Sequence, residues 1–184
     1  MYQGNNPTAI NSRDWLINAL LSLMETRPYS KITVKDICAK ADLSRQTFYN
    51  FFETKDDIIR YRIHKCYDEM MEELNQRPAL LLSDITEQLT KTFLTNGKLI
   101  NLILSQNLDH LLEFELASIM NSFAARMNPE SSGHPAEYGT AFLAGAIAHV
   151  IIFWFKDAQP VPAAQLADLL SDILTGNYYQ IKTL

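Results

Sequence analysis

Residues 42–52 read DLSRQTFYNFF and place three phenylalanines among polar side chains within one short segment. When the segment is projected at about 100° per residue from Ser44, Phe48 and Phe51 fall on one side, and Phe52 closes that side at the helix end. The other side carries Arg45, Gln46, Tyr49 and Asn50, with Thr47 on the border. The segment is therefore predicted to be a very short helix with an apolar back and a front that can donate to phosphates and base edges.

Two helices are predicted upstream of this segment. Apolar residues recur twice at the i, i+3, i+4, i+7 spacing of an amphipathic helix, which predicts helices over residues 11–26 and 33–41. The first ends before Pro28, which cannot continue a helix, and Thr33 provides an N-cap for the second. A tight turn then leads to the third helix, over residues 44–51, for which Ser44 provides the N-cap.

A helix, a short helix, a tight turn and a shorter helix with a polar front make a helix-turn-helix pattern. Residues 32–59, ITVKDICAKADLSRQTFYNFFETKDDII, resemble the signature T-V-x-D-I-A-x-x-A-G-V-S-x-x-T-x-Y-x-x-F-x-x-K-x-x-L of the TetR family of bacterial transcriptional regulators. The residues in register are Thr33, Val34, Asp36, Ile37, Ala41, Ser44, Thr47, Tyr49, Phe52 and Lys55. The strong resemblance covers residues 12–60, and beyond them only the number and lengths of the predicted helices are similar.

The sequence departs from the family pattern at four positions. Asp42 stands where the family usually has glycine in the turn, but aspartate tolerates the left-handed conformation better than most residues, so the turn is expected to form. Gln46 replaces a frequent glycine on the third helix. Pro28 replaces a glycine after the first helix, and Cys38 replaces a small alanine in the second.

The resemblance implies roles for the polar residues of this N-terminal head. Base edges of a double-stranded DNA operator would be contacted by Arg45, Gln46 and Asn50. Phosphate contacts are implied for Thr33, Ser44, Thr47, Tyr49 and Lys55, and Lys35 belongs to the same predicted DNA-binding set. The alternative is that these side chains only solvate a small helix, but the upstream pattern favours DNA binding.

The rest of the chain is also predicted to be helical. A helix over residues 54–76 would span roughly 35 Å, which suits a connector between a head and a body. Further helices are predicted over residues 83–95, 99–105, 108–127, 136–156 and 162–176. The prediction is an all-α protein of about nine helices, in which residues 1–53 form the DNA-binding domain and residues 54–184 form an effector-binding and dimerisation domain.

The last two predicted helices are the most apolar part of the body. Small residues four positions apart would let another helix come close, and large apolar residues lie beside them. These helices either pack within one chain or pair with a second copy, and the second alternative, a homodimer, is favoured. The predicted interface residues are Ala141, Ala144, Gly145, Ala148, Ile151, Phe155, Leu166, Leu169, Leu170, Ile173 and Leu174.

The resemblance also implies an effector pocket among the central helices of the body. Aromatic and methionine side chains would suit a small apolar or aromatic ligand. The predicted lining residues are Tyr67, Met70, Met71, Phe93, Leu104, Leu108, His110, Leu112, Met120, Phe123 and Trp154. For each of them the alternative is an ordinary core position or, for the histidine, a surface position.

Charge is unevenly distributed along the chain. The net charge is −5, and residues 1–60 carry eight Lys and Arg against seven Asp and Glu, whereas residues 61–184 carry eight against fourteen. This distribution permits a neutral-to-basic head on an acidic body. No signal segment or uncharged apolar run of about 18 residues is present, and the two cysteines lack a metal or redox spacing. A cytoplasmic protein that needs no membrane, metal or cofactor is expected.

Two other classes of function compete with this interpretation. An enzyme is disfavoured, because His64 and Cys66 would point roughly 200° apart on a helix and no glycine-rich phosphate loop is present. A helical adaptor without a small-molecule effector stays open, because acidic residues of the connector could bind another protein. The favoured prediction is a sequence-specific, homodimeric repressor that a ligand releases from its operator.

Overall fold

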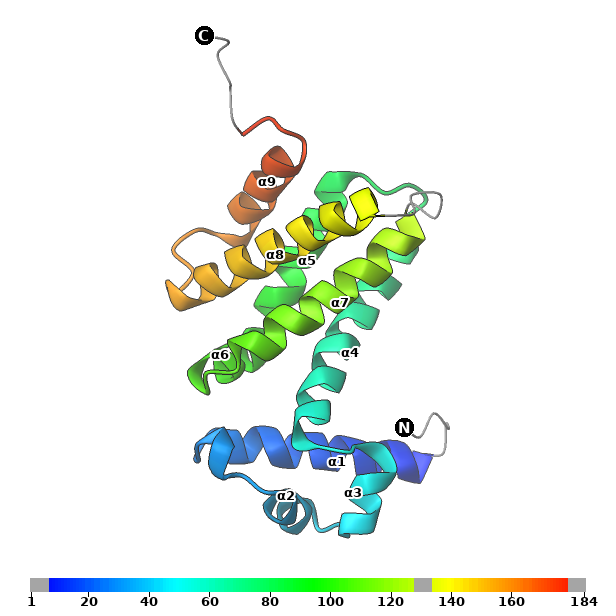
Figure 1. Cartoon of the computed structure of the whole chain (residues 1–184), viewed down its shortest axis with the longest axis vertical. Coiled ribbons are helices and arrows are strands. Elements are labelled where there is room, and N and C mark those ends of the chain that lie inside the picture. The colour runs from blue at the N-terminus through cyan, green and yellow to red at the C-terminus, as the bar shows by residue number, and fades with distance from the viewer. Residues whose placement is uncertain (1–6, 128–133, 179–184) are drawn as a thin grey trace.

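The computed structural model describes residues 7–127 and 134–178, and within these ranges it contains nine α-helices and one short 3-10 helix but no strand. The head consists of α1 (Pro7–Met24), α2 (Val34–Ala41) and α3 (Arg45–Phe51), with the 3-10 turn η1 (Tyr29–Lys31) between the first two. It lies at one end of the molecule, with α1 crossing the base of the long connector (Figure 1). The predicted all-α fold with a helix-turn-helix head is confirmed.

Helix α4 (Lys55–Asn75) leads from the head into the body (Figure 1). The body helices are α5 (Leu82–Thr95), α6 (Gly97–Ser105), α7 (Asp109–Met127), α8 (His134–Lys156) and α9 (Ala163–Leu174). Helix α7 packs along α8, and α5 packs against α9. The boundary between the predicted domains at residues 53 and 54 stays a prediction, because α4 is continuous between head and body.

The core of the head is built from the apolar sides of α1, α3 and α4. Phe48 is fully buried, and its ring centroid lies 5.9 Å from that of Phe52. Ile58 and Ile59, in the first turns of α4, are fully buried in the same apolar cluster. The start of the connector is therefore part of the head core, which fixes the direction in which α4 leaves the head.

Side-chain caps fix the N-termini of α2 and α3. Thr33 Oγ1 accepts a hydrogen bond from Asp36 N over 3.2 Å, and the Asp36 carboxylate accepts one from Thr33 N over 2.9 Å, which completes a capping box. The hydrogen bonds donated by the Thr33 hydroxyl and amide lower the pKa of Asp36. At α3, Ser44 Oγ accepts from Thr47 N over 3.0 Å. Both predicted caps are confirmed.

The turn between α2 and α3 depends on Asp42. This residue adopts φ 54° and ψ 43°, in the left-handed region, so aspartate takes the conformation that glycine usually supplies. The amide of Leu43 donates to Cys38 O over 2.9 Å and closes the turn. The expected turn is confirmed and sets α3 against α2.

We expect Asp42→Gly to raise the free energy of unfolding by about 0.5–1 kcal/mol, because glycine adopts this φ without a Cβ clash, offset in part by its larger unfolded-state entropy. Urea denaturation followed by circular dichroism measures the change. Asp42→Ala is the control, since it keeps Cβ and should be less stable than the wild type. A glycine variant no more stable than the alanine variant would contradict this reasoning.

Candidate DNA-binding site

The two sides of α3 differ as the helical projection predicts. Phe48 and Phe51 are buried, whereas Arg45, Gln46 and Asn50 are exposed. Tyr49 is 59% exposed, although its ring meets the edge of Phe48 at 5.3 Å between centroids. Within the described part of the chain, no hydrogen bond or ion pair occupies the side chains of the three exposed polar residues. The front of α3 is therefore available to a partner at the outer end of the head (Figure 1).

The hydroxyl groups predicted to hold phosphates lie at the starts of α2 and α3. Thr33 and Ser44 are exposed, and Thr47 is partly exposed. Ser44 Oγ and Thr47 Oγ1 are 2.8 Å apart and hydrogen-bonded to each other. These hydroxyls form the helix caps and still lie at the surface beside the α3 front. Lys35 is exposed on α2 and brings a positive charge to the same region.

Lys55, one of the predicted phosphate contacts, already has partners within the head. Its Nζ atom donates to Tyr29 O over 2.6 Å and to Ile32 O over 2.9 Å, and lies 4.1 Å from the centroid of the Tyr29 ring. Burial lowers the pKa of Lys55, while the neighbouring Asp56 opposes this shift. The ammonium group therefore fastens η1 to the start of α4 with two of its three N–H donors, and its contact with a phosphate stays a prediction.

The body encloses a small cavity of about 40 Å³ between α4, α5, α6 and α7. Of the predicted pocket residues, Tyr67, Met70, Phe93 and Leu112 line it. The other lining residues are Ile63, Cys66, Leu89, Thr92, Asn96, Leu99, Ile100, Leu116 and Ile119. The helical spacing i, i+3, i+4, i+7 from residue 63 gives Ile63, Cys66, Tyr67 and Met70. This pattern could have predicted Ile63 and Cys66 as lining residues from the sequence.

The remaining predicted pocket residues lie elsewhere. His110 is exposed, and the indole of Trp154 donates to Val161 O over 2.8 Å, which turns it toward the α8–α9 connection. Met71 packs in a separate small cluster with Leu74. The predicted residues that do not line the cavity are Met71, Leu104, Leu108, His110, Met120, Phe123 and Trp154. Apolar character alone did not distinguish cavity positions from the surrounding core.

A buried carboxylate ties α4 to α7 beside this cavity. Glu115 of α7 is 4% exposed. Its Oε2 lies 2.7 Å from His64 Nε2, and its Oε1 lies 3.2 Å from Arg60 Nε. Because a buried carboxylate is costly unless it is paired, these contacts hold α4 and α7 in register. They also account for His64, which pairs with a carboxylate on another helix and not with Cys66.

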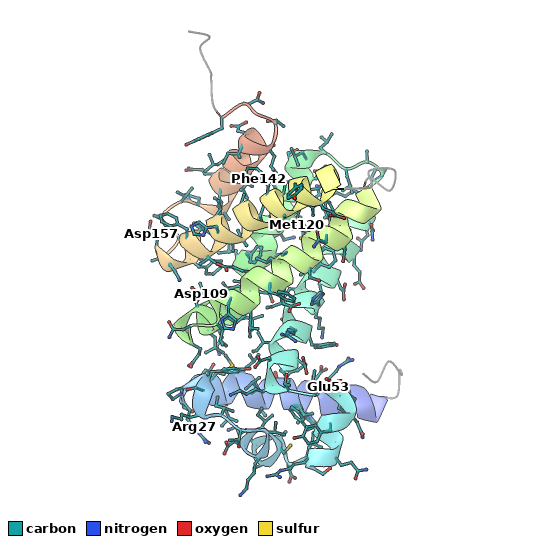
Figure 2. All side chains as sticks on the ribbon, in the orientation of Figure 1. Arg27, Glu53, Asp109, Met120, Phe142 and Asp157 are labelled. Carbon is teal, nitrogen blue, oxygen red and sulfur yellow. The ribbon has the colours of Figure 1, made fainter. Side chains whose placement is uncertain are left out.

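An exposed stripe, apolar except for His149, runs along α8. We name it the α8 stripe and define it as Tyr138, Phe142, Gly145, His149 and Phe153. Its three aromatic residues are 76%, 74% and 66% exposed, in chain order. Phe142 is labelled on α8 in Figure 2. The stripe faces away from the core that α8 shares with α7, so α8 is apolar on two opposite sides. By length and composition alone, α8 is therefore apolar enough to cross a membrane.

The predicted dimer interface needs correction in the light of this stripe. Six of its members are buried within the chain itself and are not available to a second copy: Ala144, Ala148, Ile151, Phe155, Leu166 and Leu170. Ala141, Gly145 and Ile173 are exposed, and Leu169 and Leu174 are partly exposed. The pattern of small residues therefore indicates packing inside the body as well as an exposed surface. It did not identify the aromatic residues of the α8 stripe.

The described residues hold no cluster of three or more His, Cys, Asp or Glu side chains placed to bind a metal ion. The two cysteines, Cys38 and Cys66, are both free and buried. Burial raises the pKa of both thiols.

The sequence is similar to known families and proteins. Residues 16–61 match the family described as "Bacterial regulatory proteins, tetR family", and residues 82–176 match "Transcriptional regulator C-terminal region". A curated relative, "HTH-type dhaKLM operon transcriptional activator DhaS" of Lactococcus lactis subsp. lactis (strain IL1403), is 28% identical over 67 residues. That match spans 36% of this chain and 36% of the relative's own length.

Solved structures show the same fold over nearly the whole chain. Lin0861 from Listeria innocua is 18% identical, with a TM-score of 0.75 over 96% of each chain. A TetR transcriptional regulator from Streptococcus agalactiae 2603V is 21% identical, with a TM-score of 0.63 over 91% of this chain and 95% of that one. From the two family matches, which cover the head and most of the body, the chain belongs to the TetR family of DNA-binding transcriptional regulators.

Proposed function

We propose that two copies of this chain form a homodimer that binds a pseudo-palindromic operator and represses transcription until a ligand enters the body. The observation that carries the proposal is that one chain exposes a polar α3 front on its head and an apolar α8 stripe on its body. Pairing through the stripe would bury it and bring two α3 helices to half-sites roughly 34–36 Å apart, in successive major grooves.

The geometry of the α8 stripe supports this choice of interface. Its members follow at intervals of four, three, four and four residues, which keeps them within a narrow band of the helix. Gly145, at the middle, adds no side chain and allows a second helix to approach closely. Phe142 and Phe153 flank it with large exposed rings. Exposed Ala141 and Ile173 extend the apolar area toward the roughly 800 Å² per partner of a standard interface.

On DNA, the α3 front would divide its contacts between bases and phosphates. Arg45 and Gln46 occupy the first turn of α3, the part of a recognition helix that reaches base edges. Arginine pairs best with guanine, and glutamine or asparagine with adenine, so Gln46 and Asn50 favour A·T positions in the half-site. Tyr49 and Lys35 would contact phosphates of the DNA backbone and fix the position of α3 in the major groove.

The effector proposal rests on the cavity against α4. A volume of about 40 Å³ is far below the roughly 300–1,000 Å³ of sites for drug-sized ligands, so a ligand must push the lining helices apart to enter. The surface that faces the cavity is apolar, although Tyr67, Thr92 and Asn96 are among the lining residues, and this fits a small apolar or aromatic ligand. Because α4 starts in the head core, moving it would turn the heads away from their half-sites.

Selection of bound sequences from random double-stranded DNA tests the proposal. The wild type should recover an inverted repeat. Gln46→Ala should relax the preference at one base pair of each half-site, a loss of about 1–3 kcal/mol if the contact is bidentate. Tyr49→Ala should weaken binding to all sequences and leave the preference unchanged, because a phosphate contact carries no base information.

The two variants are matched controls for each other, since both truncate an exposed residue of α3. An unchanged base preference in Gln46→Ala would remove its assigned role. Recovery of a single, unrepeated site by the wild type would argue against the homodimer. No enrichment at low salt, from a protein with a native circular dichroism spectrum, would contradict the whole proposal.

A second candidate function, a transcriptional activator or adaptor with no small-molecule effector, is favoured by the small volume of the cavity. It also agrees with the DhaS relative, which is named a transcriptional activator. A thermal-shift screen with apolar and aromatic compounds separates the two candidates. Stabilisation by such a compound, lost when Leu112→Trp fills the cavity, supports the ligand-released repressor, whereas a body that no compound stabilises supports the adaptor.

A further inference from the structure

Gln106 lies directly after α6 and reaches from the body into the head. Its Oε1 atom accepts a hydrogen bond from Tyr29 N over 2.7 Å. Its Nε2 atom donates to Met24 O over 2.8 Å and, at a longer distance of 3.4 Å, to Arg27 O. One carboxamide thus engages three backbone groups of the head, 77 to 82 residues away in the sequence. In Figure 1 the turn after α6 lies above the C-terminal end of α1.

The head groups that Gln106 engages lack partners in regular structure. Met24 is the last residue of α1, and the last four carbonyl groups of an α-helix have no intrahelical donor. Tyr29 begins η1, so its amide lies before the first hydrogen bond of that turn. The side chain of a body residue therefore caps the C-terminus of α1, a helix of the head.

Gln106 itself is held in a fixed place on the body. Helix α6 ends in a Schellman motif, in which Leu108 N donates to Ile103 O and Asn107 N donates to Leu104 O, both over 3.1 Å. Asn107 takes the left-handed conformation of this motif at φ 57°. Because the backbone on both sides of Gln106 is hydrogen-bonded, the position of its side chain is fixed relative to α6.

Tyr29 is fixed equally well on the head side. Its hydroxyl donates to Asp56 Oδ1 over 2.5 Å, and its carbonyl accepts from Lys55 Nζ over 2.6 Å. Burial, together with the bond to Asp56, raises the pKa of Tyr29, so the hydroxyl stays protonated and keeps donating. Tyr29 thus joins η1 to the first turn of α4, and Gln106 joins both to α6.

The other polar contact between α6 and α1 is weaker. Lys98 Nζ lies 2.7 Å from Glu25 Oε1, but the two side chains are 86% and 44% exposed. Exposed ion pairs contribute little to stability and are screened by salt. Helix α6 also lines the cavity, through Leu99 and Ile100. One short helix therefore contacts the cavity in its first turn and fastens the head just after its last residue.

We infer that Gln106 is a positioning residue that sets the orientation of the head on the body, and thereby the half-site spacing that a dimer accepts. The inference rests on the proposed homodimeric DNA binding. Three hydrogen bonds in different directions restrict rotation of α1 relative to α6 as well as their separation, which an exposed ion pair does not. Without them α4, the packing of α1 against α6 and the exposed Lys98–Glu25 ion pair still connect the head to the body, but the two heads can adopt a wider range of separations.

The test measures binding to a panel of DNA duplexes in which two copies of the selected half-site form inverted repeats whose separation increases one base pair at a time. The wild type should show a sharp optimum. Gln106→Met keeps the side-chain volume but makes no hydrogen bonds, and it should lower the ratio of best to neighbouring affinities by about five-fold or more. Affinity for a single half-site should not change. Asn101→Met, at an exposed position of the same helix, is the control.

A second readout is the hydrogen exchange of the Tyr29 amide, which needs no DNA. Its protection should be lost in Gln106→Met and kept in Asn101→Met. A sharp, wild-type spacing profile in Gln106→Met, whatever its melting temperature, would overturn the inference. If Gln106→Met does not fold, Gln106→Asn is measured instead, and an unchanged profile there has the same meaning. A wild type without any spacing optimum would contradict the proposed dimer itself, which is a different result.

Discussion

Phe48→Ala should lower the free energy of unfolding by about 3–5 kcal/mol, which is a large part of the stability of a domain of this size. The side chain is fully buried at the centre of the head and contacts the ring of Phe52 at 5.9 Å between centroids. Its removal takes away the apolar support of α3 and leaves a cavity between α1, α3 and α4. Urea denaturation measures the loss, and binding to the selected operator should disappear with the fold of the head.

The neighbouring residue provides the control. Tyr49 is 59% exposed, so Tyr49→Ala should change the free energy of unfolding by less than about 0.5 kcal/mol while it weakens DNA binding. The pair therefore separates stability from recognition on one helix. A loss below about 1 kcal/mol in Phe48→Ala would mean that α3 does not depend on this contact, and the account of the head core would then be wrong.

The second large effect is expected at the α8 stripe. Phe142→Arg places a charge beside the centre of the proposed interface and should convert the dimer into a monomer, because an unpaired buried charge is strongly unfavourable. Operator affinity should then fall by about 10²–10⁴-fold, since the two heads no longer bind as a linked pair. Sedimentation gives the mass in solution, and fluorescence anisotropy with labelled operator gives the affinity.

Leu94→Arg is the matched control, because Leu94 is also an exposed apolar residue of the body but lies on α5, outside the stripe. It should leave both mass and affinity unchanged. The affinity of Phe142→Arg for a single half-site should also stay at the wild-type value. A variant that remains dimeric would place the interface elsewhere on the body and would require a different pairing of the two heads.

Most of the head was predictable from the sequence because its determinants are local. The helical spacing, the caps at Thr33 and Ser44, and the tolerance of Asp42 for the left-handed region all act within a few residues of one another. The role of Lys55 was not predictable in this way. Its partners are carbonyl groups of residues 29 and 32, and nothing in a sequence shows that a backbone oxygen 23 to 26 positions away lies within reach of the ammonium group.

The body was predictable as a set of helices but not in its surfaces. Helix α8 is apolar on nearly every side, so periodicity could not tell which residues meet α7 and which remain exposed. Ala144 and Ala148 look as suitable for an interface as Gly145, yet they are buried within the chain. The cavity depends on how four helices pack together, and the role of Gln106 depends on a contact between residues 77 or more positions apart. Neither feature leaves a local pattern in the sequence.

The burial of Ile58 and Ile59 in the head core has a consequence for anyone who wishes to build a chimeric regulator from this chain. Grafting residues 1–53 onto a foreign body would leave the graft without the two isoleucines that seal its underside. The exchange point belongs inside α4, beyond Ile63. Even then, the foreign body would need its own amide donor and acceptor opposite the end of α1. The module that can be transplanted is thus larger than the segment that resembles a DNA-binding domain.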